Sequence, residues 1–258
     1  MIPKTIHYCW FGRGELPQVA ERCIQSWKRL LPDYEIIRWD EDSFDISSNK
    51  YVKQAYDAKK YAFVSDYVRL YAIYTCGGIY MDTDVEVLRN LDVFLSNEAF
   101  SGFENVFAVP TGIMAGEKGL NVYSDLLSWY DENDFLLPDG SMNLTTNVST
   151  ITSYFVQRGL KQNNTMQVID GFAFYPNIVF CPYKHEIGSK YFHQDTYTIH
   201  HKDGSWMTDN LRRIAKTGIK ARASLHLKKA LLSLIGKQKL DWLLLQSFKL
   251  RSVKRNVQ

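Results

Sequence analysis

The sequence predicts an α/β fold whose central sheet is mixed but mostly parallel and is flanked by helices. In the N-terminal third, short apolar runs of strand length alternate with longer segments of helical periodicity, an order typical of β-α-β units. Turn-forming residues mark the boundaries between these segments, as at Gly12, at Pro32 and at Gly77-Gly78. The 258 residues are enough for one such domain with a small appendage.

The spacing of apolar residues assigns each element in turn. The helix opened by Pro17 carries Val19, Cys23, Trp27 and Leu30 at helical intervals. A second helix over 61–76 is followed by glycine, the residue that most often ends helices. Further helices are expected over 120–130 and 148–158, and strands over 4–9, 34–39, 79–81, 100–103, 112–115, 166–169 and 196–200.

Charge divides the chain unevenly. Residues 211–258 hold 13 Lys and Arg and one acidic residue, a net charge of +12, whereas the rest has 18 basic and 27 acidic residues. We therefore expect a globular domain over 1–210 and a basic amphipathic helical tail over 211–258. Such a tail suits a polyanionic partner, a membrane surface or a nucleic acid, although it could also pack on the domain.

The cysteines and the N-terminal segment predict the cellular compartment. Four scattered cysteines without a C-x-x-C pair favour a reduced, cytoplasmic protein. The N-terminus runs directly into a predicted strand, and neither a signal peptide nor an apolar run long enough to cross a membrane is recognised.

Two aspartates form the sharpest chemical signal. Asp82-Thr83-Asp84 follows the short apolar strand over 79–81, and in extended backbone the first and third side chains point to the same side. Paired carboxylates at the end of a buried strand are costly unless a cation joins them. A hard divalent ion binds carboxylate and phosphate oxygens together. The alternative is a solvated turn.

A second pair lies on the preceding helix. Asp66 and Arg69 share one helical stripe with Ala62 and Ile73, which predicts that they face inward. The pair is either a structural ion bridge or a sugar site, in which Asp66 accepts from hydroxyls and Arg69 donates to the sugar or the diphosphate.

The run from Ala62 to Asp84 resembles the signature of glycosyltransferase family 32, whose sugar-binding region contains a DXD motif. That signature reads S-D-x-x-R, a short spacer, then G-G-x-Y-x-D-x-D. Its fixed positions are matched here by Ser65, Asp66, Arg69, Gly77, Gly78, Tyr80, Asp82 and Asp84. The opening I-P-K-T-I-H-Y-C-W-F-G and the later W-D-E-D are also similar to the family. The likeness covers residues 2–115 well, 181–206 moderately and the tail not at all.

The resemblance implies a GT-A fold, a Rossmann-like mixed sheet, and a glycosyltransferase that retains anomeric configuration and needs Mn²⁺ or Mg²⁺. In similar enzymes a tryptophan at the end of the first strand stacks on the nucleobase, and Trp10 matches it; its alternative is a core position. The implied nucleotide-binding set is Trp10, Asp66, Arg69, Gly78, Tyr80, Asp82 and His201, and the implied catalytic set is Asp66, Arg69, Asp82, Asp84 and Trp206.

A late segment, T-I-H-H-K-D-G-S-W, completes the expected site. Relatives often carry such a segment, and one of its histidines is expected as a third ligand beside Asp82 and Asp84. Because adjacent strand residues point oppositely, only one of the two can face the metal, and the sequence does not decide which. His200 is taken as the metal ligand and His201 as the residue that binds a phosphate. Trp206 matches a tryptophan that contacts the glycosidic oxygen in similar enzymes.

The predicted function is transfer of a hexose from a nucleotide diphosphate donor, most simply a UDP-hexose, to a bacterial polysaccharide or lipid-linked glycan. The expected setting is the cytoplasm, on the inner face of the cell membrane where the tail binds anionic lipid, without a nucleic-acid partner. Two alternatives remain open: another metal-dependent sugar-nucleotide enzyme, such as a hydrolase or nucleotidyltransferase, and a non-catalytic binding module. A nucleotidyltransferase would need a stronger glycine-rich loop than Gly12-Arg13-Gly14.

Overall fold

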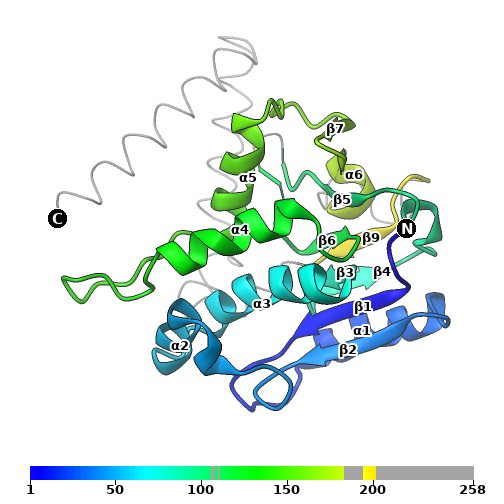
Figure 1. Ribbon diagram of the computed structural model, residues 1–258. Helices are drawn as coiled ribbons and strands as arrows, with labels where there is room; N and C mark the ends of the chain where they lie inside the picture. Colours follow the sequence, from blue (N-terminus) through cyan, green and yellow to red (C-terminus); the bar gives the residue numbers. More distant parts are fainter. Residues whose placement is uncertain (106–107, 110, 183–193, 202–258) are drawn as a thin grey trace, which may run out of the picture. The chain divides into compact units, whose positions relative to one another are not determined.

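A central sheet organises the computed structural model, which describes residues 1–105, 108–109, 111–182 and 194–201 (Figure 1). Its strand order is β2-β1-β3-β6-β5-β8-β7. Within the described residues, five of these strands run in one direction and β6 and β7 run in the other. The predicted mixed, mostly parallel α/β architecture is therefore confirmed. The bounds are β1 Thr5–Cys9, β2 Glu35–Trp39, β3 Gly78–Met81, β5 Ala99–Gly102, β6 Ile113–Gly116, β7 Gln167–Ile169 and β8 Phe172–Tyr175.

The helices are α1 Gln18–Leu30, α2 Lys50–Asp57, α3 Tyr61–Cys76, α4 Asn121–Glu132, α5 Asn147–Gln157 and α6 Asn177–Phe180, with short 3₁₀ turns over Ile46–Ser48 and Asp92–Phe94. The predicted helix over 61–76 has the observed bounds. A second small sheet pairs β4 (Val85–Val87) with β9 (Thr198–His200) in antiparallel fashion. Sequence reasoning did not predict α2, α6, β4 or β8, which are short or lack a distinct periodicity.

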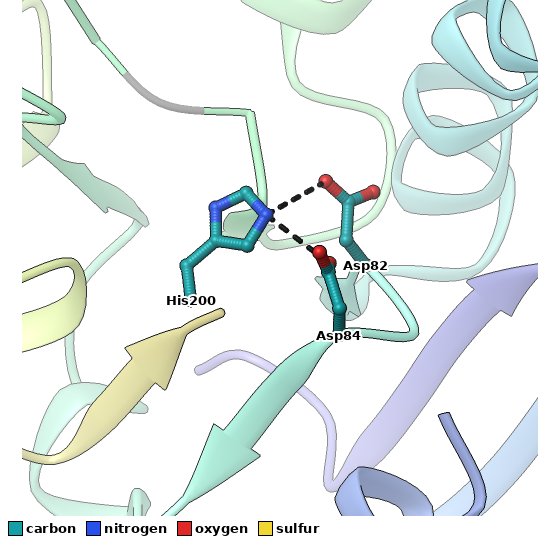
Figure 2. A group of neighbouring side chains, drawn as sticks. All are labelled: Asp82, Asp84 and His200. Carbon is teal, nitrogen blue, oxygen red and sulfur yellow. Dashed lines mark ion pairs between the residues drawn. The ribbon is translucent and has the colours of Figure 1, made fainter. Parts of the chain in front are cut away.

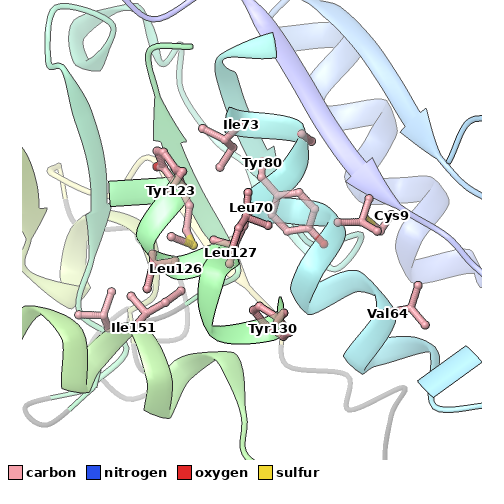
Figure 3. Close-up of a cluster of buried hydrophobic side chains, with 14 of the residues drawn as sticks. Cys9, Val64, Leu70, Ile73, Tyr80, Tyr123, Leu126, Leu127, Tyr130 and Ile151 are labelled. Carbon is pink, nitrogen blue, oxygen red and sulfur yellow. The ribbon is translucent and has the colours of Figure 1, made fainter. Parts of the chain in front are cut away.

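Each face of the sheet is covered by its own apolar cluster. On one face, Ile6 and Tyr8 of β1 pack with Trp27 of α1. On the other, Cys9 of β1 packs with residues of α2, α3, α4 and α5, and Figure 3 shows this second cluster around Tyr80. Neighbouring side chains of β1 alternate between the two clusters, so the described helices cover both faces of the sheet. The polar residues of the site then lie at the carboxyl ends of the strands.

The turn between α3 and β3 requires glycine. Gly77 and Gly78 have φ of 71° and 111°, a left-handed region that favours glycine. A Cβ on Gly78 would lie 2.6 Å from the carbonyl oxygen of Thr5. The turn therefore brings the chain back against β1 at once, so that β3 delivers its last residue to the edge of the sheet where β1 and β2 also end.

Several predictions fall at the limits of what the structure describes. Trp206 and the tail over 211–258 lie outside the described residues, so both predictions stand as they were made. The four cysteines form no disulfide with one another. Among the described helices, none is long and apolar enough to cross a membrane.

Candidate functional site

Asp82 and Asp84 lie at the carboxyl end of β3. The amide of Asp82 donates to the carbonyl of Gly112 at 2.8 Å, and the amide of Val85 donates to the carbonyl of Asp82 at 3.0 Å. This tight turn leads directly into β4, so the two carboxylates emerge side by side (Figure 2). Their side chains are 25% and 18% exposed, which leaves them reachable by a ligand while shielding them from bulk water.

His200 reaches the same point from the far end of the described chain. It pairs with Val85 in the β4–β9 ladder, and its Nε2 lies 3.1 Å from Asp84 Oδ1 and 3.9 Å from Asp82 Oδ2 (Figure 2). His201 contacts Glu86 instead, at 2.9 Å. The alternation of the strand therefore brings His200, and not His201, to the carboxylates.

Electrostatics reflects the closeness of these three groups. Burial lowers the pKa of His200, but the hydrogen bond that its imidazole donates to Asp84, the hydrogen bond with the Cys181 side chain and the charges of Asp84 and Asp82 outweigh this effect and raise that pKa to about 10. Without a bound cation, the protonated imidazole therefore supplies a compensating positive charge between the two carboxylates. A cation bound at Nε2 would take the place of that proton, because only the neutral imidazole is a metal ligand.

The same three side chains fit a divalent cation. One ligand atom from each of Asp82, Asp84 and His200 lies within 4.8 Å of the others. Two carboxylate oxygens and one imidazole nitrogen are donors that Mn²⁺ accepts, and Mg²⁺ takes the oxygens as well. The three residues would hold the ion jointly, with open positions left for oxygen atoms of a substrate.

Arg69 braces this site from beneath. Its side chain is 6% exposed, and its guanidinium contacts Asp66 at 3.0 Å and Asp82 at 3.3 Å. It also donates to the carbonyls of Ser65 at 3.2 Å and Thr111 at 2.7 Å. Many of its donors are therefore used within the protein, and the Asp66–Arg69 ion bridge, one of the two alternatives that the sequence left open, is present.

Tyr80 helps to aim Asp82. Its hydroxyl donates to Asp82 Oδ1 at 2.9 Å, the same oxygen that faces Arg69, and the guanidinium of Arg69 lies 4.7 Å from the centre of the Tyr80 ring. Oδ1 is thus turned toward Tyr80 and Arg69. The second oxygen, Oδ2, faces His200 and the place of the cation.

Asp66 lies beside the cation site at the amino end of α5. Its Oδ2 accepts from the backbone N–H of Asn147 at 3.4 Å, and the Asn147 side chain donates to the Asp66 carbonyl at 2.9 Å. Burial raises the pKa of Asp66 to about 6, with Asp82 adding to the rise while Arg69 and the Asn147 amide oppose it. The Oδ1 of Asn147 is buried and has no hydrogen-bond partner among the described residues.

Other residues expected at the site are placed elsewhere. Gly78 lies at the amino end of β3, against Thr5 and His7, where it serves the turn. Trp10 follows β1 at the same edge of the sheet as Asp82, and its indole N–H donates to the Gly14 carbonyl at 2.7 Å. The structure therefore brings Asp66, Arg69, Tyr80, Asp82, Asp84 and His200 into one connected cluster. Gly78 and His201 have other contacts, and Trp10 lies after β1, where its predicted role toward the nucleobase stays a prediction.

Gly112 and Asn147 are site residues that sequence reasoning missed. Asn147 gave no signal beyond lying in a polar loop, and Gly112 gave none beyond being a glycine. A Cβ on Gly112 would lie 2.6 Å from His200 Nδ1 and 2.8 Å from Cε1, closer than carbon atoms approach without a shift. The absence of a side chain at Gly112 therefore makes room for the imidazole.

Gly112→Ala is expected to displace His200 and to weaken Mn²⁺ binding by roughly ten- to hundredfold, a typical loss when a ligand's support is disturbed. Isothermal titration of the variant with Mn²⁺ measures the change. Gly14→Ala is the matched control, because a Cβ there meets nothing within 4 Å. Unchanged Mn²⁺ affinity in Gly112→Ala would contradict the assignment of His200 as a ligand.

Comparison with known proteins identifies the segment that builds this site. Residues 17–101 match the family model described as the glycosyltransferase sugar-binding region containing a DXD motif. Inositol phosphoceramide mannosyltransferase 3 of Schizosaccharomyces pombe is 32% identical over 122 residues, which is 46% of this chain and 34% of that protein. An uncharacterized glycosyltransferase of Acanthamoeba polyphaga mimivirus is 26% identical over 220 residues, 80% of this chain and 84% of that protein.

The yeast-type relatives are longer than the matched region. The chain spans about a third of the length of the three fungal proteins it matches, the third being the mannosyl phosphorylinositol ceramide synthase of Saccharomyces cerevisiae. Among solved structures, a glycosyltransferase involved in glycosylation of the major capsid of PBCV-1 aligns over 80% of this chain and 96% of its own, with a TM-score of 0.47 and 12% identity.

The matched segment contains α1, α2, α3, β3 and β4, and with them Asp66, Arg69, Asp82 and Asp84. Its D-x-D is Asp82-Thr83-Asp84, whose side chains lie with His200 in the geometry described above. Residues 17–101 of this chain therefore match the glycosyltransferase sugar-binding region containing a DXD motif both in sequence and in the placement of its two aspartates.

Proposed function

We propose that this chain is a glycosyltransferase that takes a sugar from a nucleotide diphosphate donor with a divalent cation held by Asp82, Asp84 and His200. The observation that supports it most strongly is the convergence of these three ligand atoms within 4.8 Å at the carboxyl edge of the sheet. The GT-A fold that the resemblance implies agrees with this placement, because nucleotides bind at that edge of open α/β sheets.

In this proposal each residue has one task. A bound divalent cation supplies positive charge that grips the pyrophosphate and stabilises it as a leaving group. Arg69 keeps the carboxylates of Asp66 and Asp82 in place and does not itself contact the donor. Asp66 accepts hydrogen bonds from sugar hydroxyls, and the free Oδ1 of Asn147 is a second acceptor beside it. Trp10 stacks on the nucleobase, and Trp206 contacts the glycosidic oxygen.

We favour retention of anomeric configuration by attack on the same face of the sugar. A double displacement would need a carboxylate nucleophile below the anomeric carbon. Asp82 and Asp84 are committed to the cation and Asp66 is held by Arg69 and Asn147, so the described part of the site offers no spare carboxylate. The departing phosphate then takes the proton of the acceptor hydroxyl. NMR of the product anomer tests this route, and an inverted product would exclude it.

The donor and the acceptor are proposed from the family resemblance and from the names of the relatives. A UDP-hexose is our first proposal for the donor, and a growing capsular polysaccharide, another bacterial glycan or a lipid-linked glycan for the acceptor. Three fungal relatives are named for mannosyl transfer to inositol phosphoceramide or for its synthesis, so mannose donors and lipid acceptors belong in the same test.

One experiment tests the function. The full chain is incubated with Mn²⁺ and in turn with UDP-glucose, UDP-galactose and GDP-mannose, and release of nucleoside diphosphate and the thermal midpoint are followed. We expect one donor to raise the midpoint and to be hydrolysed slowly without acceptor, and EDTA to abolish both effects. Turnover of nucleoside triphosphates with sugar phosphates would instead favour a nucleotidyltransferase, and a lack of any response would reject the proposal.

We also propose that the tail over 211–258 binds anionic lipid at the inner face of the cell membrane. Its net charge of +12 and interleaved leucines support surface binding that is driven by charge. The full chain is expected to sediment with vesicles containing phosphatidylserine, to be released by high salt and to ignore neutral vesicles. Equal binding to both vesicle types would contradict this.

A further inference from the structure

The order of the strands reverses at β1, and this defines a topological switch point in the sheet. The connection from β1 to β2 runs through α1 on one face of the sheet, whereas the connection from β2 to β3 runs through α2 and α3 on the other. The carboxyl ends of β1 and β3 therefore flank a topological switch point, and such switch points bind nucleotides in open α/β sheets. Asp82 lies on the β3 side of this switch point, and the loop over residues 10–14 lies on its β1 side.

This loop is tied to the residues that follow β2. The amide of Trp10 donates to the carbonyl of Trp39 at 2.9 Å, and the amide of Gly12 donates to Glu41 Oε1 at 2.6 Å. Arg13 forms two bonds to Asp42, at 2.6 and 2.7 Å, but the Asp42 side chain is 71% exposed, whereas that of Glu41 is 7% exposed. Buried hydrogen bonds to a charged acceptor hold geometry better than exposed ion pairs do.

The same carboxylate also reaches the helices that carry the sugar site. Glu41 Oε1 accepts from the Tyr56 hydroxyl of α2 at 2.9 Å, and the Tyr56 ring packs on Tyr61, the first residue of α3, with centroids 5.4 Å apart. A Cβ on Gly12 would lie 2.4 Å from the Tyr61 ring, so the loop is seated directly on that ring. Helix α3 then continues to Asp66 and Arg69.

From these contacts we propose that Glu41 is a positioning residue for the nucleoside half of the donor site. Its carboxylate fixes the Trp10 loop against α2 and α3, so that the indole lies where the base arrives when the diphosphate is at Asp82. The inference rests on the proposed function, because it needs a nucleotide donor. Both hydrogen bonds of this clamp end on Oε1, whereas Oε2 is buried, makes no hydrogen bond among the described residues and lies 3.9 Å from Arg13 Nε.

The test is a double-mutant cycle on nucleotide affinity. Dissociation constants for UDP and for GDP, each with saturating Mn²⁺, are measured by titration calorimetry for the wild type, Glu41→Ala, Trp10→Ala and the double variant. We expect each single change to weaken binding of the nucleotide that the protein accepts by about tenfold or more, as loss of a base stack does. The double variant should bind no more weakly than Trp10→Ala, because Glu41 acts through the loop.

Rescue separates positioning from a general loss of stability. Glu41→Gln keeps an acceptor oxygen for Gly12 and Tyr56 and is expected to bind within about twofold of the wild type. Glu35→Ala, at the exposed start of β2, the strand that precedes Glu41, is the control for a glutamate without this role. Additive losses in the double variant, or a Gln variant as weak as the Ala variant, would overturn the proposal. A wild type that binds neither nucleotide would instead reject the proposed function.

Discussion

Asp84→Asn is expected to abolish sugar transfer, with a loss of about a thousandfold or more, which corresponds to at least ~4 kcal/mol in the activation free energy. The substitution keeps the shape of the side chain but removes the negative charge and one oxygen ligand beside His200, at the centre of the three-residue cluster. Turnover of the accepted donor measures the loss of transfer, and titration with Mn²⁺ measures the loss of cation binding. We expect the two to be lost together, because the bound cation is needed to stabilise the leaving group.

Asp82→Asn should cripple transfer without removing it. Its Oδ1 faces the donors Tyr80 and Arg69 and its Oδ2 faces His200, so the single oxygen of asparagine can serve only one of these two sides. Binding of the cation is then weakened, while Asp84 and His200 still hold it. The control is Asp139→Asn, an exposed loop aspartate that bonds only Ser141 within the described residues and should leave transfer unchanged. Near-normal turnover by Asp84→Asn, with its thermal midpoint preserved, would remove the metal from the mechanism.

The sequence was sufficient to predict the part of the site that lies on one continuous segment of the chain. Helix α3 and strand β3 each show their character within one short window, and the S-D-x-x-R and D-x-D positions lie on them at fixed spacing. The inward stripe of Asp66 and Arg69 follows from helical periodicity alone, and the structure confirms that both face the sheet edge.

The other half depends on pairings between distant segments. His200 could not be separated from His201 because the choice depends on how β9 pairs with β4, and β4 is too short to be recognised. The partner of Arg69 at Thr111 is a backbone carbonyl, which no side-chain pattern reports. Gly112 likewise matters only because a histidine from another strand occupies the space above it. Prediction of the site was therefore limited by the pairing register of distant strands, and not by local propensity.

Arg69→Ala is expected to have the largest effect on stability. It removes the buried cation between Asp66 and Asp82 and leaves two shielded carboxylates without their partner. Breaking a buried pair in this way typically costs about 3–5 kcal/mol, against well under about 1 kcal/mol for an exposed pair. The pKa of Asp66, now about 6, should rise further because Arg69 is a group that lowers it. Denaturant unfolding measures the free energy, and transfer should be lost as the aspartates move.

Arg158→Ala provides a matched comparison, because Arg158 also faces two aspartates and lies over a tyrosine ring, but at the surface. Its guanidinium is 3.6 Å from Asp125 and 3.8 Å from Asp170, and its side chain is 36% exposed. If burial is what makes Arg69 indispensable, the Arg158 variant loses little stability and no transfer. Arg69→Lys should fall between them, since an ammonium keeps the charge but cannot serve both aspartates and the Ser65 and Thr111 carbonyls at once. Equal losses in the Arg69 and Arg158 alanine variants would show that the network beneath the D-x-D is dispensable.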